Sequence, residues 1–203
     1  MKLEIDIPYA KSNVRNIHCH QLLSLVLTAH FNSARNQNNI SSTYFFNTLL
    51  ITDNMASAIA SAVLTIGKEH APITQARTVF SKWSHQDIAN AIERGEKVPG
   101  FGNAFYKDDI DPAWFPVRDY LRTFMPAVHA HLDNLTLAVN TEIQKRSNKN
   151  VNPIFPNPAM YSAIVTELFG WEEGSELSFF VLARLPAWVS LVFGTKGLDG
   201  ETE

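Results

Sequence analysis

The sequence predicts an all-α fold, and two observations carry that prediction. Helix start and stop signals recur along the 203 residues: a capping residue, in places followed by proline, opens a stretch with an apolar face, and a glycine closes it. The strict alternation of apolar and polar residues that is typical of a half-buried strand is rare. We find neither an internal repeat nor a low-complexity tract, so one compact domain or two small lobes fit the length.

Two helices are expected in the first third of the chain. Residues 20–31 read HQLLSLVLTAHF and are expected to form the first of them. Residues 43–66 form a longer stretch rich in Ala and Ser, which permits close packing of helices. Ser41 or Ser42 is available as the N-cap residue of this second helix, and Gly67 is expected to end it.

The middle of the chain is expected to hold a short helix and then a proline-interrupted helical region. Ser84 and Asp87 have the spacing of a capping box, and Gly95 is expected to stop the helix that follows them. Asp111 precedes a proline at the first position of the next helix. That region is broken at two further prolines before it ends near Lys145.

A connector separates this region from the last two helices. Residues 147–158 are rich in proline and asparagine, which favour turns, so they are expected to form a hinge or a lobe boundary. Asn157 then caps a helix that runs to about Phe169. The last helix is expected over residues 175–194, with a kink at Pro186.

Composition excludes several classes of protein. Seventeen Lys and Arg against twenty Asp and Glu give a net charge of -3, with no basic block, so nucleic acid is not an expected partner. Cys19 is the only cysteine, which excludes a disulfide framework and a cysteine-based zinc site. A single cysteine is compatible with a reducing compartment, so a cytoplasmic location is expected.

A membrane partner is not expected either. Residues 44–66 and 177–193 are apolar, but the first stretch contains Asp53 and the second contains Arg184. A charged side chain at the centre of a membrane helix costs about 2.5 to 3.5 kcal/mol on insertion scales, so buried helices are the better interpretation. The N-terminus has acidic residues where a signal peptide needs a basic and then an apolar segment.

The clustered histidines and aspartates do not predict metal sites. The histidines come in pairs two residues apart, which point away from each other on a helix, and the aspartates lack the central glycine and the bidentate Glu of a calcium loop. We expect ordinary histidines and a solvated acidic turn. These residues are His18, His20, His129 and His131, and Asp108, Asp109 and Asp111.

Three segments in a particular order carry the information about function. Residues 67–71 read GKEHA, residues 98–107 read VPGFGNAFYK and are followed by an Asp-Pro pair, and residues 155–162 read FPNPAMYS and are followed by FFVLAR. Together they resemble the citrate synthase family, whose segments read like GPLHGGA, PGFGHxxYKxxDPR, PNVDFYSG and FxxARxxGW. The resemblance spans most of residues 40 to 190.

The resemblance implies a two-lobe helical fold of the citrate synthase type. Residues 1–70 and 159–203 would form a truncated large lobe, and residues 71–158 the small lobe. The two lobes of the family close over the substrates and exclude water. The resemblance also implies a homodimer formed through the long central helices, or a hetero-oligomer with a homologue, and the small residues 56–62 suit that packing.

The chemistry of the family sets demands on the site. Condensing an acyl-CoA with an oxo-acid needs a carboxylate that removes a proton next to the thioester. It also needs a neutral imidazole that donates to the enolate oxygen, a second imidazole that polarises the ketone, and arginines that hold the carboxylates. All these groups must be present together.

Only part of this set is retained. His70 matches the histidine that contacts the thioester, with Glu69 beside it where the family has leucine. Asn103 stands in place of the second catalytic histidine, and asparagine cannot relay a proton. Ala159 stands in place of the aspartate base, and an alternative alignment would put Asn152 there.

The groups that hold the substrate carboxylates are also reduced. Gln37 stands at the place of a further substrate-binding histidine, and Ala113 replaces the arginine of the DPR segment. Arg184 is retained. A buried arginine must find a partner, which is either a ligand or an internal carboxylate such as Glu167.

Recognition of coenzyme A is better preserved. In the family, the PGFG loop lines the coenzyme A site and a basic residue follows it. The matching residues here are Val98, Gly100, Phe101, Gly102 and Lys107. The other interpretation is that the loop survives because its glycines are needed for the turn. No covalently bound cofactor is expected.

Three functions follow. The first is a citrate synthase-like protein with a degenerate site, a pseudoenzyme that binds an acyl-CoA or a small carboxylate without ordinary turnover. The second is an active acyl-CoA condensing enzyme (an acyltransferase) or a citryl-CoA-type lyase, in which Glu69, Asp108 or Asp109 serves as the base beside His70. The third is a structural subunit that assembles with a full-length homologue.

Overall fold

The computed structural model describes residues 13–34, 40–66, 72–103, 106, 109–147 and 151–196, with side chains from Ile17 to Ser190. Within these ranges the secondary structure is helical, and the only pairing of extended backbone is an isolated bridge between Phe101 and Pro156. The prediction of an all-α fold is confirmed. None of the helices in these ranges is long and apolar enough to cross a membrane.

The helices follow one another along the chain with short connections. Their bounds are α1 Asn13–Ala34, α2 Ile40–Thr52, α3 Met55–Leu64, α4 Ile73–Lys82, α5 His85–Glu93, the 3-10 helix η1 Pro112–Trp114, α6 Phe115–Phe124, α7 Pro126–Arg146, α8 Pro158–Leu168 and α9 Ser175–Lys196.

The helix starts that depend on local capping are confirmed. Ser84 and Asp87 form the capping box of α5, with the Ser84 N–H donating to the Asp87 carboxylate at 2.7 Å. Asn157 caps α8 by accepting from the backbone N–H of Ala159 at 3.0 Å. The last helix lies where it was expected but ends two residues beyond Gly194, and Pro186 lies inside it.

The single helix expected over residues 43–66 is wrong, because the chain turns at its centre. Asp53 adopts a left-handed conformation with φ of 46°, and Asn54 accepts from the Ser57 N–H and starts a new helix. Two antiparallel helices, α2 and α3, result. Ser41 and Ser42 lie inside the first turn of α2 and are buried, so neither is its N-cap residue.

Two further helices differ from the expectation. The helix expected over residues 20–31 is longer at both ends, and α4 was not predicted at all. α4 begins directly after Pro72 and presents Ile73, Ala76, Val79 and Phe80 as one buried face. Its face packs on α8, which makes it a central element.

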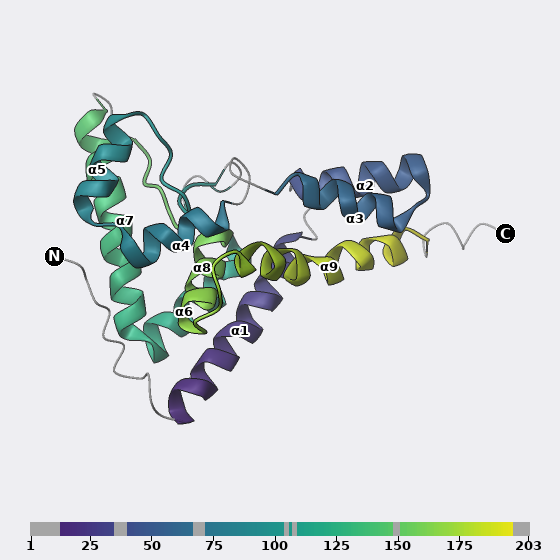
Figure 1. Ribbon diagram of the computed structural model, residues 1–203, viewed down its shortest axis with the longest axis horizontal. Helices are drawn as coiled ribbons and strands as arrows, with labels where there is room; N and C mark the ends of the chain where they lie inside the picture. Colours follow the sequence, from purple (N-terminus) through teal and green to yellow (C-terminus); the bar gives the residue numbers. More distant parts are fainter. Residues whose placement is uncertain are drawn as a thin grey trace.

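Helices far apart in the sequence meet in the core. α1 packs on α9, α6 and α8, and α5 packs on α7. Figure 1 shows the α2–α3 pair side by side beyond the rest of the bundle, next to the second half of α9. One apolar cluster joins α1, α4, α6, α7 and α8, so it takes residues from both expected lobes, and the lobe boundaries stay a prediction.

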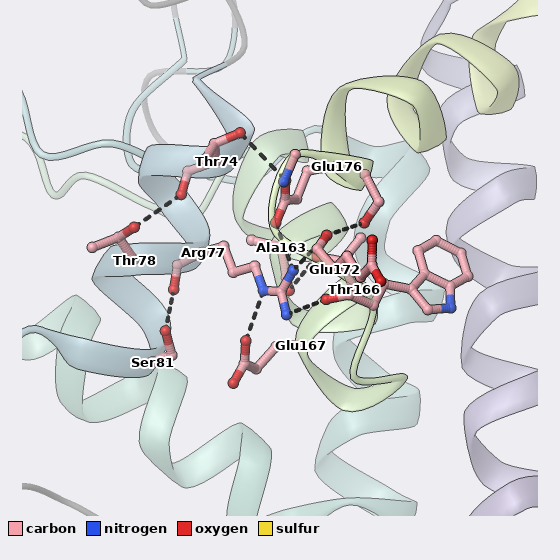
Figure 2. A network of polar contacts seen from close by, with 12 residues as sticks. Thr74, Arg77, Thr78, Ser81, Ala163, Thr166, Glu167, Glu172 and Glu176 are labelled. Carbon is pink, nitrogen blue, oxygen red and sulfur yellow. Dashed lines mark hydrogen bonds and ion pairs between the residues drawn. The ribbon is translucent and has the colours of Figure 1, made fainter.

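An arginine ties α4 to the turn between α8 and α9 (Figure 2). Arg77 donates from Nε to Glu167 at 2.7 Å and from Nη1 to Glu176 at 2.6 Å. Its Nη2 donates to the Trp171 carbonyl at 2.7 Å. Burial alone raises the pKa of Glu176, but hydrogen bonds from Arg77 and backbone N–H groups outweigh it and hold that pKa below its ordinary value.

Candidate functional site

Arg184 lies on the buried face of α9 and has no carboxylate partner among the described residues. Only 2% of the residue is exposed. Its Nη1 donates to Ser41 Oγ at 3.3 Å, and its guanidinium carbon lies 4.3 Å from the centre of the Phe180 ring, one turn earlier on α9. Its Nε–H is buried and makes no hydrogen bond to any described group.

Among the described residues, the positive charge of Arg184 is therefore poorly compensated. Burial lowers the pKa of Arg184 to about 10, and the negative charge of Asp111 offsets part of that effect. The side chain remains a cation at neutral pH. A carboxylate ligand would supply the counter-charge that a buried guanidinium needs.

Glu167 is not the internal partner that the sequence suggested. Its carboxylate pairs with Arg77 and is partly exposed. The two arginines are thus in opposite states: the partly buried Arg77 has two carboxylates within 2.7 Å, and the buried Arg184 has none within ion-pair distance in the described part of the chain. This contrast marks the surroundings of Arg184 as the candidate anion site.

His30 of α1 adjoins Arg184 and was missed by the sequence analysis. Its ring contacts the Phe180 ring edge-on at 4.7 Å, and its Nε2 lies 2.7 Å from Ser162 Oγ. Burial lowers the pKa of His30 well below its ordinary value of 6.5, and the charge of Arg184 lowers it further. His30 is therefore a neutral imidazole at neutral pH. The available signal was a histidine inside a leucine-rich predicted helix, residues 20–31.

Asp111 is the second residue that the sequence analysis misjudged. It is buried, so the expectation of a solvated turn is wrong for this residue. It accepts from Ser33 Oγ at 2.8 Å and, as the N-cap residue of η1, from the Ala113 N–H at 3.0 Å. Asp109 is exposed and lies 3.6 Å from Arg118. Asp108 lies outside the described residues.

The positions expected for acid–base catalysis carry no carboxylate where the structure describes them. Ala159 is 2% exposed and packs in an apolar cluster with Ala76, Ala163 and Phe180. Ala113 is half-buried, and Asn152 is exposed. Asn103 is half-buried at the end of the PGFG loop. Glu69, His70 and Gln37 lie outside the described residues.

The PGFG loop is held by backbone pairing with the segment before α8. Gly100 and Gly102 both have φ values above 80°. The Asn157 N–H donates to the Gly100 carbonyl at 2.9 Å, and the Gly102 N–H donates to the Phe155 carbonyl at 2.8 Å. These contacts show that the glycines serve the turn. Val98 is buried, Phe101 is half-buried, and Lys107 lies outside the described residues.

No group of three or more His, Cys, Asp or Glu in the described ranges is arranged to hold a metal ion. His129 lies 3.0 Å from Asp133, and His131 contacts the Phe80 carbonyl through Nε2 at 2.7 Å. Both therefore have partners within the helical bundle.

The fold and the site define a class: an all-α protein with a buried cation and a neutral imidazole between α1, α8 and α9. The sequence matches the family described as citrate synthase, C-terminal domain, over residues 21–198. The chain therefore belongs to the citrate synthase family, as its motifs suggested.

Comparison with solved structures agrees with the family. A citryl-CoA lyase from Hydrogenobacter thermophilus has a TM-score of 0.66 and 19% sequence identity to this chain, over 93% of this chain and 78% of that chain. At this identity the match shows a common fold. No curated protein sequence matches the chain.

Proposed function

We propose that the protein binds a small carboxylate, or its coenzyme A thioester, at Arg184 and does not carry out ordinary citrate synthase condensation. The observation that carries this proposal is the buried guanidinium of Arg184, which has no carboxylate partner in the described structure. Desolvating a charge is costly unless an opposite charge accompanies it. A carboxylate bound between α1 and α9 would meet that need.

The proposed absence of ordinary turnover rests on the residue that replaces the family's base. Ala159 stands where the family has its aspartate, and its methyl group is buried in an apolar cluster. A general base typically contributes two to four orders of magnitude in rate. With Ala113 in place of an arginine as well, we expect little condensation of acetyl-CoA with oxaloacetate.

Coenzyme A is the second ligand that we propose. The PGFG loop has the positive φ values that favour glycine at positions 100 and 102, and Lys107 follows a few residues later in the sequence. The Gly100 carbonyl and the Gly102 N–H already form hydrogen bonds with the segment before α8. Contacts to coenzyme A would therefore come from the remaining backbone groups of the loop and from Lys107.

Calorimetric titration with citrate and with coenzyme A tests the proposal, together with a coupled thiol-release assay on acetyl-CoA and oxaloacetate. We expect binding of citrate, binding of coenzyme A, and no family-like release of thiol. Turnover at the level of a citrate synthase would contradict the proposed pseudoenzyme. Failure of both ligands to bind would contradict the ligand site.

A citryl-CoA-type lyase is the alternative, and the solved structure of such an enzyme with the same fold favours it. In this reaction a carboxylate such as Glu69 would act beside His70. Cleavage of citryl-CoA by the parent protein, lost in the Glu69→Gln and His70→Ala variants, would establish the lyase. Cleavage that persists in both variants would rule out these two residues.

We also propose that the α2–α3 pair is the surface through which the chain associates. Residues 40–66 contain one charged residue, Asp53. Tyr44, Leu50, Ile51 and Leu64 are exposed on this pair, which contacts α9 within the described fold. Exposed apolar surface of this kind favours association, and a second copy of this chain is the partner we propose.

A further inference from the structure

Trp114 contacts His30, the neighbour of the Phe180 ring on which Arg184 lies, and it carries a polar group that has no partner among the described residues. It is the last residue of η1, it is 1% exposed, and it stacks on Tyr161 at 5.2 Å between ring centres. Its indole Nε1–H is buried and makes no hydrogen bond to any group that the structure describes. Buried indole N–H groups normally have an acceptor, and leaving one unpaired is costly.

His30, whose ring contacts the Trp114 ring, carries a second buried polar atom without a partner among the described residues. The Trp114 and His30 rings meet edge to face, with 4.8 Å between their centres. Ser162 Oγ lies 2.8 Å from the Pro158 carbonyl and 2.7 Å from His30 Nε2. With its one hydroxyl hydrogen donated to the carbonyl, Ser162 accepts from the Nε2–H tautomer of His30. The neutral ring then has its lone pair on Nδ1, and this buried atom has no partner among the described groups.

Three buried polar atoms without a hydrogen-bond partner among the described residues thus belong to one cluster of side chains. His30 and Arg184 both contact the Phe180 ring, and Trp114 contacts His30. The cluster offers two N–H donors, from Trp114 and Arg184, and one acceptor, from His30. A charged ligand with carboxylates alone would satisfy the donors and leave His30 Nδ1 unpaired.

A hydroxyl group complements the neutral pair because it accepts one hydrogen bond and donates another. It would accept from Trp114 Nε1–H and donate to His30 Nδ1, while a carboxylate of the same ligand pairs with Arg184. An oxo group accepts but cannot donate, and a methylene group does neither. We infer that Trp114 is a specificity-determining residue that, with His30, selects a hydroxy acid over an oxo acid or an unsubstituted acid. This inference rests on the proposed binding of a small carboxylate at Arg184.

Paired titrations with citrate and tricarballylate test the inference, because the two ligands carry the same three carboxylates and differ by the hydroxyl group. We expect the parent to bind citrate about 10- to 100-fold more tightly than tricarballylate, since the analogue leaves both polar atoms unpaired. Trp114→Phe keeps an aromatic ring and removes the N–H, and it should reduce this ratio at least several-fold. The matched control is Trp188→Phe, because the Trp188 indole already donates to Ser42 Oγ at 3.3 Å. That variant should keep the parent's ratio.

The outcomes separate the two proposals. Equal binding of citrate and tricarballylate by the parent would overturn the hydroxyl preference while leaving the carboxylate site in place, as expected if an ordered water occupies the cluster. Binding of neither ligand would overturn the proposed site and the inference together. The NMR resonance of the Trp114 indole N–H in the parent protein provides a second measurement, which does not depend on the Trp114→Phe variant being folded. It should move with citrate and not with tricarballylate, and the same movement with both would overturn the inference.

Discussion

Arg184 and Arg77 place the same guanidinium group in opposite surroundings. Arg184 is buried without a carboxylate among the described residues, whereas Arg77 bridges two carboxylates. Replacing Arg184 with Met keeps an unbranched stem about as long as the aliphatic part of the arginine, and it removes a charge that has no carboxylate partner among the described residues. We expect the free energy of unfolding to stay unchanged or to rise by up to about 2 kcal/mol, and the stabilisation by citrate to disappear. Urea unfolding with and without citrate measures both effects.

Arg77→Met is the matched control, with the opposite expected sign. It leaves the Glu176 carboxylate, whose side chain is fully buried, without its cation. Removing one partner of a buried ion pair typically costs 3–5 kcal/mol, so we expect a loss of about 3 kcal/mol. Any effect of citrate on the folded protein should survive. Equal destabilisation by the two substitutions would contradict the view that Arg184 lacks a partner.

The pH dependence of stability should report His30. Its pKa in the folded state lies below 6.5, so the sign follows from which state binds protons. Above pH 6.5 the imidazole is neutral in both states and does not alter stability. Below pH 6.5 the unfolded chain binds a proton that the folded chain does not, so stability falls by at most about 1.4 kcal/mol per pH unit. Unfolding at pH 7 and pH 5.5 measures this fall, and His30→Gln should reduce it. An unchanged slope in the variant would mean that other groups cause it.

Sequence and structure diverge at the residue scale where partners lie far apart in the chain. The sequence predicts Arg184 as a candidate site residue, because its helix matches a family motif. The contact of His30 with Ser162 joins residues 132 positions apart, and the contact of Ser33 with Asp111 joins residues 78 positions apart. No local pattern encodes such a contact. Burial of Asp111 was therefore not predictable from an acidic segment that is typical of a turn.

Local chemistry explains which helices the sequence predicts correctly. α5 and α8 begin after capping residues whose side chains bind backbone N–H groups two or three positions later, and both starts were predicted. α4 has no side-chain cap, and its burial depends on α8, about 80 residues later. The division between α2 and α3 depends on one left-handed residue, Asp53, inside a stretch that otherwise favours one helix.

Alanine substitutions at two glycines test whether backbone geometry and close packing hold the PGFG loop in place. A Cβ atom on Gly100 would lie 2.6 Å from the Met160 terminal methyl carbon and 3.0 Å from Ala76 Cβ. Gly95 has a similar positive φ with open space around it. Gly95→Ala should cost about 1 to 2 kcal/mol from backbone strain alone. Gly100→Ala should cost at least about 1 kcal/mol more, because overpacking is added. Equal losses in urea unfolding would show that the loop yields to the added methyl group.

At the scale of the whole molecule, the position of the α2–α3 pair supports the proposed assembly through this surface. The pair lies at one end of the bundle (Figure 1). In the described structure, α9 is the main element outside the pair that α2 and α3 contact. Ile51 and Leu64 are 84% and 85% exposed at its two ends. An apolar surface with so little charge is typical of an obligate interface.

Lysine substitutions at these two positions test the proposed dimer. We expect the parent to be a dimer by light scattering after size exclusion, and the Ile51→Lys, Leu64→Lys double variant to be a monomer with unchanged helical circular dichroism, because each lysine would have to be desolvated in the interface. Leu137→Lys is the control, since that exposed residue lies on α7, away from the pair. A parent that remains monomeric at every concentration would contradict self-association. Copurification of a longer homologue with that monomer, lost in the double variant, would identify the same surface as the contact of a hetero-oligomer.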